Sequence, residues 1–315
     1  MEQYKDINIL FLGGAKRVSL AEKFIDEGKK RGIKISIFSY ELTDEVPIAF
    51  VGKIIPGLKW NDVDIYQHLN KVVEKHKINI IIPFLDFATI IAAKLKEKLK
   101  DKNIFIPVSD ENNCEIFFNK TLADNWCKNN DINVPSDLSN FPLIAKPVTG
   151  SASKGIIIIG SEEEYNKLAN KENYLIQKFI NGKEYSVDIY ISTKDKEIIS
   201  IVPRERLETQ GGESIRSKTI KESYFIRFAQ NIIKKTNLEG PVTLQFIEDS
   251  KTKELYFLEI NPRFGGAVLN SIFAGANSPS FLLNDYLNIK NTYTEDWLDQ
   301  FLMIRRFSEY YKICK

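Results

Sequence analysis

Three oxygen-bearing side chains near the C-terminal end of the sequence have a spacing that two neighbouring β-strands would bring together. Glu259 and Asn261 lie two positions apart at the end of an apolar run, so a strand points both to the same face. Gln245 lies on an expected preceding strand. Such oxygens suit Mg²⁺, which completes its shell with water and phosphate, and the same ligands can hold Mn²⁺. The alternative is a solvated polar face of a ribbon, although an unpartnered acid in so apolar a run is costly to bury.

Basic and glycine-rich residues follow directly. Arg263 lies two positions beyond Asn261 and would place a fixed cation beside the same phosphates. Gly265 and Gly266 then open an expected helix over Ala267–Phe273, where backbone amides could receive a carboxylate or an acyl phosphate.

A second candidate site is a lysine followed by a flexible loop. Lys146 ends an expected strand, and the loop Thr149–Gly155 runs into the next one. The N–H groups of such a loop can cradle phosphate oxygens, and Lys146 can add a charge. The loop is not a Walker A motif, because it lacks GxxxxGK[ST] and feeds a strand; a plain hairpin with a flexible tip is the alternative. The candidate phosphate-binding residues of the loop are Gly150, Ser151, Ser153 and Gly155.

A third candidate surrounds Asn181-Gly182, a dipeptide typical of a turn between two strands. The segment just before it, with Gln177, Lys178, Phe179 and Ile180, could offer backbone groups to an adenine edge, and Glu184 could accept from ribose hydroxyls. An ordinary hairpin is the alternative.

Weaker candidates remain. Arg204 and Arg206 precede the polar stretch Gly211–Ser214, which suits an acidic substrate or, equally, a surface loop. Gly13-Gly14 lacks the full GxGxxG and is interpreted as a tight turn. The two histidines, His68 and His76, have no evident partner and are interpreted as solvated.

The elements that must position these residues follow two different sequence patterns. Up to Ser109, apolar strands alternate with charged helices, which predicts a parallel doubly wound α/β sheet. Beyond it the pattern is α+β. The expected strands of the first part are 7–12, 34–40, 78–83 and 104–107, and its expected helices are 20–31, 64–76 and 88–99. The later expected strands are 143–146, 155–159, 174–179, 184–192, 198–202, 242–247 and 255–260, and the helices are 119–130, 162–168 and 222–236.

Bulk composition excludes some classes. The 315 residues carry a net charge of +2 with both signs interleaved, which gives no reason to expect nucleic acid. Three cysteines without metal-ligand spacing indicate reduced thiols. We see no signal peptide and no membrane-spanning run, so we expect a soluble cytoplasmic protein.

Taken in order, these residues resemble the ATP-grasp superfamily, and most closely its carbamoyl-phosphate-synthase-like branch of carboxylate–amine ligases. The resemblance covers about Ser109 to Asp285. It implies a pre-ATP-grasp domain over 1–109, a small lobe over 110–185 and a large lobe over 186–315, with ATP bound between the lobes. Its markers are Lys120, Ala145-Lys146-Pro147, Gln177-Lys178-Phe179-Ile180-x-Gly-x-Glu184, Gln245 and Glu259-Ile260-Asn261-Pro262-Arg263-Phe264-Gly265-Gly266.

The resemblance also implies roles. Lys120 and Lys146 would hold phosphates, and the 178–180 segment would face adenine. Gln245, Glu259 and Asn261 would ligate Mg²⁺. Arg263 would lie on the phosphate side, and Arg204 is similar in place to substrate-side arginines.

Two departures matter. Lys178 stands where many relatives have Glu, which leaves the purine edge to backbone groups. The chain also has a single ATP-grasp unit and no glutaminase domain, so carbamoyl phosphate synthesis by this chain alone is not expected.

The implied activity is formation of an amide or peptide bond from a small carboxylate and an amine through an acyl phosphate. A kinase-like protein that stops at the phosphorylated acid, and an ATP-binding protein without catalysis, are the alternatives. Relatives are commonly dimers, so a homodimer stays open.

Overall fold

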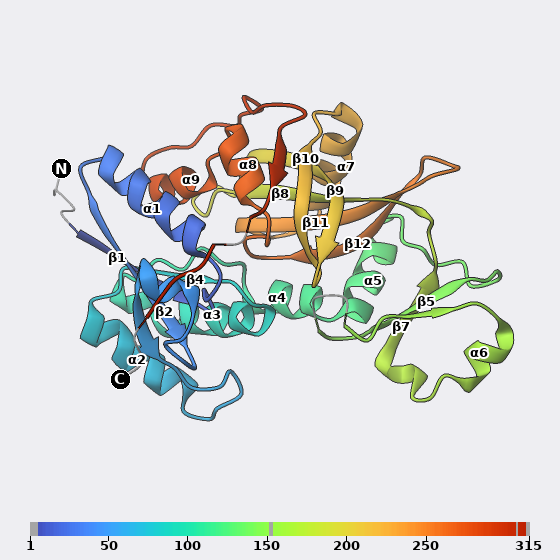
Figure 1. Cartoon of the computed structure of the whole chain (residues 1–315), viewed down its shortest axis with the longest axis horizontal. Helices are drawn as coiled ribbons and strands as arrows, with labels where there is room; N and C mark the ends of the chain where they lie inside the picture. The colour runs from blue at the N-terminus through green and yellow to red at the C-terminus, as the bar shows by residue number, and fades with distance from the viewer. Residues whose placement is uncertain (1–5, 151–153, 307, 313–315) are drawn as a thin grey trace.

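The protein, seen here in a computed structural model, is built on three β-sheets that follow one another along the chain (Figure 1). The structure describes residues 6–150, 154–306 and 308–312. A parallel sheet comes first, a three-stranded sheet forms a small lobe, and a six-stranded sheet forms a large lobe. Figure 1 shows the small lobe standing apart at one end, joined to the rest through helices α4 and α5.

The first sheet has the order β3-β2-β1-β4, and all its pairings are parallel. Its central strand β1 carries a nearly continuous buried run, as expected for a strand covered on both faces. The elements are β1 (Asp6–Leu12), α1 (Val18–Lys30), β2 (Lys34–Glu41), η1 (Pro47–Phe50), β3 (Lys53–Pro56), α2 (Ile65–His76), β4 (Ile80–Pro83), α3 (Asp86–Lys98) and η2 (Lys100–Lys102).

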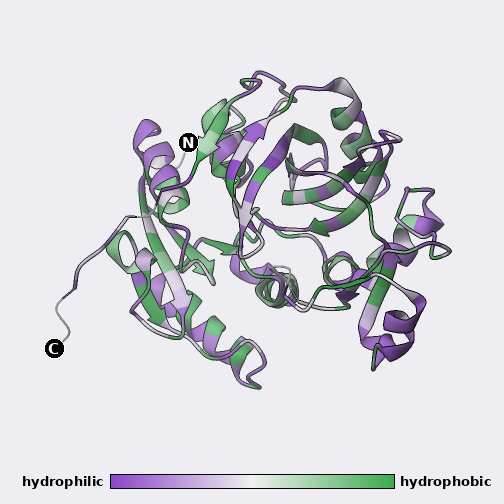
Figure 2. Ribbon diagram, turned by 45° about the vertical axis from the view of Figure 1, so that its right-hand side comes forward, coloured by the Kyte–Doolittle hydropathy of each residue, from purple (hydrophilic) through white to green (hydrophobic). Residues whose placement is uncertain are grey.

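Two helices lead from this sheet into the small lobe. Asp110 and Asn119 cap them by accepting hydrogen bonds from backbone N–H groups in their first turns. Figure 2 shows the small lobe's helix α6 as mostly hydrophilic, and none of its residues is buried. The elements are α4 (Glu111–Phe118), α5 (Lys120–Asn129), β5 (Leu143–Pro147), β6 (Ile157–Ile159), α6 (Glu162–Lys167), η3 (Lys171–Asn173) and β7 (Tyr174–Lys178).

The large lobe is an antiparallel sheet of order β12-β11-β8-β9-β10-β13. Helix α7 covers one part of it with an apolar face that includes Phe225, Ala229 and Ile232. The elements are β8 (Gly182–Ile191), β9 (Ile198–Gln210), β10 (Glu213–Thr219), α7 (Ser223–Ile233), β11 (Gly240–Asp249), β12 (Leu255–Asn261), α8 (Leu269–Ala274), α9 (Ser278–Tyr286) and β13 (Leu302–Ile304).

The N-terminal domain and the large lobe share one hydrophobic core. Phe264, which follows β12, contacts the rings of Phe24 and Phe84 at centroid distances of 6.3 and 6.1 Å. Arg31 at the end of α1 donates to the Ser280 hydroxyl of α9 over 2.6 Å. These two parts are therefore held together by packing, whereas the small lobe has its own core around Leu143, Ala145 and Ile159.

The expected fold class is confirmed, but several local expectations were wrong. Asn181-Gly182 is not a hairpin turn, because β7 belongs to the small sheet and β8 to the large one. A Cβ on Gly182 would lie 2.0 Å from the Glu248 carbonyl oxygen, so glycine is needed there for close strand approach. The expected strand 104–107 forms only an isolated bridge between Ile80 and Phe105.

Further differences occur along the whole chain. Strands β3 and β13 were not predicted, and His68, interpreted as solvated, is half-buried and shares a 2.6 Å hydrogen bond with the Tyr40 hydroxyl. Strand β9 continues to Gln210 and turns through Gly211-Gly212 into β10, where a polar loop was expected. Helices α4 and α9 were not predicted, and the helix expected at Ala267 begins at Leu269. The domain limits at 109 and 185 stay predictions. In the part of the chain that the structure describes, no helix is both long enough and apolar enough to cross a membrane.

Candidate active site

A cavity of about 320 Å³ lies where the three parts of the chain meet. Among the described residues it is lined by eight basic and four acidic side chains, and this excess of positive charge suits a polyphosphate. The basic ones are Arg17, Lys120, Lys146, Lys154, Lys178, Arg204, Arg206 and Arg263, and the acidic ones are Asp86, Glu184, Glu213 and Glu259.

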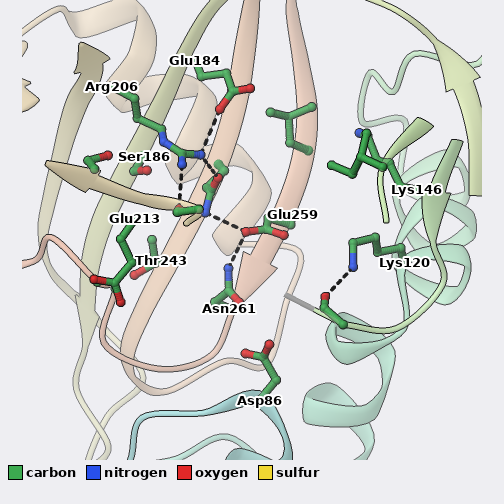
Figure 3. A pocket seen from close by; sticks show the side chains of 18 of the residues that line it. Asp86, Lys120, Lys146, Glu184, Ser186, Arg206, Glu213, Thr243, Glu259 and Asn261 are labelled. Atoms are coloured by element: carbon green, nitrogen blue, oxygen red, sulfur yellow. Dashed lines mark hydrogen bonds and ion pairs between the residues drawn. The ribbon is translucent and has the colours of Figure 1, made fainter. Parts of the chain in front are cut away.

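The three expected metal ligands do meet on one face of the sheet. Gln245 is paired directly with Glu259 in the register of β11 and β12. The Gln245 Nε2 group donates to Glu259 Oε1 over 2.6 Å, and Asn261 Nδ2 donates to the same oxygen over 2.9 Å (Figure 3). The expectation that Glu259 and Asn261 share a face is confirmed.

These ligands fit a cation that brings most of its coordination shell with it. They supply one carboxylate and two amides, and no group of three His, Cys, Asp or Glu side chains in the described parts of the chain could hold a metal. The amide oxygens are already in use, because Gln245 Oε1 accepts from Arg206 over 2.6 Å and Asn261 Oδ1 accepts from Arg263 over 2.9 Å. The donor set therefore suits Mg²⁺ that arrives with a nucleotide, and not a metal held by protein ligands alone.

The two expected phosphate lysines lie on the opposite side of the cavity, on the small-lobe side (Figure 3). Lys120 at the start of α5 donates to the Gly150 carbonyl over 2.8 Å. Lys146 on β5 donates to Gln177 Oε1 over 2.9 Å. Gln177 is buried behind Lys146 and donates in turn to Asp124 over 2.7 Å. Gln177 thus does not line the cavity but positions the lysine that does.

The charge on Lys146 is costly without a bound anion. Burial lowers the pKa of Lys146 below its usual value, and Glu259 and Glu184 oppose this shift. Lys120 adds to the lowering as a like charge. Negative charge placed beside Lys146 would offset the desolvation, so this corner of the cavity is suited to an anion.

The glycine loop between β5 and β6 borders the same corner. Gly150 lines the cavity and has a φ of +113°, a conformation that favours glycine. The strands on either side pair as an antiparallel hairpin, so the hairpin interpretation is correct and is compatible with a phosphate-binding tip. Gly155, with a φ of +73°, lies at the far side of the loop and does not line the cavity. Ser151 and Ser153 lie outside the described residues.

The segment expected to face adenine also lines the cavity. Its N–H groups are largely occupied, since Lys178 donates to the Pro135 carbonyl over 3.0 Å and Phe179 to the Pro142 carbonyl over 3.1 Å. The Ile180 N–H has no hydrogen-bond partner among the described residues and is the amide left for a ligand. Glu184 is 47% exposed at the rim and accepts from Arg206 over 2.9 Å.

The arginines are all held by carboxylates or amides. Arg204 is 1% exposed, and its Nε and Nη2 atoms donate to both oxygens of Asp188 at 2.7 and 3.1 Å. Its third nitrogen, Nη1, is buried and has no partner among the described residues. Arg263 donates to Asp86 Oδ1 over 2.7 Å and to Asn261. Arg204 therefore keeps the two N–H donors of Nη1 free, and Arg263 links the metal-ligand face to the N-terminal domain.

The sequence analysis missed the contribution of the N-terminal domain. Arg17, just after β1, and Asp86, just after β4, both line the cavity. Glu213 was expected in a polar loop, either on the surface or beside an acidic substrate, but it lies on β10 and pairs with Arg17 over 3.1 Å. The signal in the sequence was the end of each parallel strand, since ligands of open α/β sheets bind at the carboxyl ends of the strands.

Comparison with known proteins agrees with this fold. Residues 170–305 match the family described as ATP-grasp in the biosynthetic pathway with Ter operon. The biotin carboxylase domain of the Hydrogenobacter thermophilus 2-oxoglutarate carboxylase, a dimer in complex with MgADP, superposes with a TM-score of 0.72 at 15% identity, over 93% of this chain and 72% of that one. The Staphylococcus aureus N5-carboxyaminoimidazole synthetase complexed with ADP gives a TM-score of 0.72 at 18% identity, over 91% and 79%.

The chain is an ATP-grasp superfamily protein. By sequence it is 26% identical over 180 residues to the D-alanine–D-alanine ligase of Rickettsia canadensis (strain McKiel), which is 50% of each chain. It is 24% identical over 285 residues to the formate-dependent phosphoribosylglycinamide formyltransferase of Prochlorococcus marinus (strain AS9601), 81% of this chain and 69% of that one. The chain spans about half the length of the curated ligases it matches. The expected superfamily is confirmed, whereas the branch within the superfamily and the activity stay predictions.

Proposed function

We propose that this ATP-grasp protein is an ATP-dependent carboxylate–amine ligase. The observation that carries the proposal is the arrangement of opposite charges across one cavity. Lys146 and Lys120 line its small-lobe side, and Glu259, Gln245 and Asn261 line its large-lobe side. A nucleotide triphosphate lying between them would have cations beside its phosphates and oxygen ligands for Mg²⁺. The two structural neighbours bind MgADP and ADP, which supports a nucleotide as the ligand of this cavity.

Mg²⁺, held by Gln245, Glu259 and Asn261 when bound, would neutralise charge on the phosphates. The residues of the chain have separate tasks. Lys120, Lys146 and Arg263 would stabilise the phosphoryl group in transfer, where positioning and electrostatics supply most of the acceleration. The Ile180 N–H would contact the base, and Glu184 would accept from the ribose.

The reaction would proceed in two steps. The substrate carboxylate attacks the γ-phosphorus of ATP, the bond to the β-phosphate oxygen breaks, and an acyl phosphate and ADP form. The amine then attacks the acyl carbon and phosphate leaves. No side chain needs to act as a covalent nucleophile. The free Nη1 donor of Arg204 would orient the carboxylate, and the loop after Lys146 would keep water from the acyl phosphate.

The test is a screen of ADP release with small carboxylates and amines, alone and in pairs, followed by mass spectrometry of products. A ligase releases ADP much faster with both substrates than with either one. Release that depends on the acid alone, with a phosphorylated product, would assign the kinase-like alternative. Binding of ATP without any stimulated release would assign the non-catalytic alternative and reject the proposal.

A further inference from the structure

The cavity has a second basic end that the nucleotide does not need. Arg17 enters it from the loop after β1, at the side away from Lys146. Figure 3 shows Glu213, the partner of Arg17, across the cavity from Lys146 and Lys120, with Glu259 and Asn261 between them. A triphosphate bound at the lysines and the metal ligands would leave this end for the other substrates.

The location within the fold is one where ligands are expected. The sheet order β3-β2-β1-β4 changes direction between β1 and β4, and the crevice at the carboxyl ends of such strands is the usual ligand site of an open parallel sheet. Arg17 follows β1, and Phe84 and Asp86 follow β4, so all three lie at this crevice. The Arg17 guanidinium lies over the Phe84 ring at 5.9 Å.

The charges at this end do not balance. Arg17 Nη2 and Arg305 Nη1 share the single carboxylate of Glu213, at 3.1 and 2.7 Å, and both arginines also donate to the Gly266 carbonyl. Arg305 lies behind Glu213 and does not line the cavity, whereas Arg17 does. Burial lowers the pKa of Arg17, Glu213 opposes this shift, and the like charges of Arg263 and Arg305 add to it. Arg17 is 14% exposed, and only two of its five N–H donors are used among the described residues.

The backbone is shaped to let these groups meet. A Cβ on Gly266 would lie 2.7 Å from the Glu213 carboxyl carbon, so any side chain there would push Glu213 away from the arginines. Gly211 and Gly212, which precede Glu213, have φ values of +57° and +77°. The tight β9–β10 turn therefore places Glu213 where it can orient Arg17 toward the cavity.

We propose that Arg17 is a specificity-determining residue that binds a non-reacting carboxylate of the substrate, with Glu213 and Arg305 as positioning residues. The inference rests on the proposed ligase function and deepens it by naming the substrate class. At least one substrate, the activated acid or the amine, therefore carries a carboxylate that does not react, as an amino acid does when its amine is the reacting group. A guanidinium matches such a group with two parallel hydrogen bonds.

The experiment uses the full chain with Mg·ATP and a panel of the twenty common amino acids, D-alanine and D-glutamate, each compared with its carboxamide. Both ADP release and thermal stability are measured. For an active pair, we expect replacement of the anchoring carboxylate by an amide to raise KM by about ten- to one-hundred-fold. Replacing it on the acid or on the amine identifies which substrate carries it.

The variant Arg17→Leu should raise KM for the carboxylate substrate to a similar extent, leave kcat within about threefold, and no longer distinguish acid from amide. Arg17→Lys should restore part of the affinity. The control is Arg31→Leu. Like Arg17, Arg31 is a partly buried arginine that joins the α1 region to the large lobe, here through Ser280, but Arg31 does not line the cavity. Its KM should match that of the wild type.

The outcomes separate the two proposals. If a pair is active and Arg17→Leu keeps its KM and its preference for the acid, the anchoring role is wrong while the ligase function stands. If panel members stabilise the wild type but not Arg17→Leu, and none stimulates ADP release, the anchor is supported and the ligase function is not. If no panel member stabilises or stimulates the wild type, the anchor is rejected.

Discussion

Replacement of Glu259 by Gln tests the metal-ligand face directly. Glu259 is the only carboxylate among the three expected ligands, and its Oε1 atom accepts hydrogen bonds from Gln245 and Asn261 at 2.6 and 2.9 Å. A glutamine has nearly the same volume and keeps an oxygen that can accept both bonds. The substitution therefore removes one negative charge and leaves the local packing intact.

The expected effect is large on activity and small on stability. A bound cation contributes several kcal/mol to phosphoryl transfer. Loss of its only anionic protein ligand should cost about 3–5 kcal/mol of that, or about two to four orders of magnitude in kcat/KM. The free energy of unfolding without nucleotide should change by about 1 kcal/mol or less, since only neutral-for-charged hydrogen bonds are exchanged.

The assay is Mg²⁺-dependent binding of a fluorescent ATP analogue, which requires no knowledge of the substrates, together with ADP release once an active pair is found. Glu205→Gln is the matched control, because Glu205 is an ion-paired, largely buried carboxylate on the same sheet that does not line the cavity. Glu259→Gln should need much more Mg²⁺ for nucleotide binding, and Glu205→Gln should not. Unchanged Mg²⁺ dependence in Glu259→Gln, with more than a third of normal turnover, would refute the assignment.

Three further predictions follow from the same contacts. Burial in the folded protein lowers the pKa of Lys146, so between that lowered pKa and the usual value the unfolded chain binds more protons than the folded chain, and the free energy of unfolding rises with pH. Lys146→Met should thus lose ATP binding without a lower Tm in nucleotide-free protein at pH 7, and a clear fall in Tm would contradict this. Asp188→Asn leaves the Arg204 charge buried and unpaired, so urea unfolding should show a free energy of unfolding lower by about 3–5 kcal/mol. The double variant Asp188→Asn/Arg204→Met should recover part of this loss, and equal losses in the two variants would be contrary evidence. Burial raises the pKa of the Cys114 thiol to about 12, so at pH 8 it is protonated and peptide mapping should find it unalkylated in the native protein but alkylated in urea; native labelling would show the burial to be wrong.

Local pattern was sufficient for most elements of this fold. Strand β1 and helix α2 were predicted to within two residues, because a continuous apolar run and a 3.6-residue period are properties of the chain itself. The same alternation rule placed Glu259 and Asn261 on one face, and the structure agrees. Pattern was least informative where polar residues are buried, as at β10: Ser214 was interpreted as part of a loop, and no strand was expected at the buried Ser217 and Thr219.

The sequence by itself determined the superfamily and the order of its phosphate-side residues, because the order and spacing of these residues can be recognised without knowing which residues are in contact. Only the tertiary structure decided which strands share a sheet, that Gln177 lies behind Lys146, and that Arg17 reaches the cavity. The physical reason is distance along the chain: Arg17 and Glu213 are 196 positions apart, and no local period encodes a contact between them. Such ion pairs depend on the packing of whole domains, here through the shared core around Phe264.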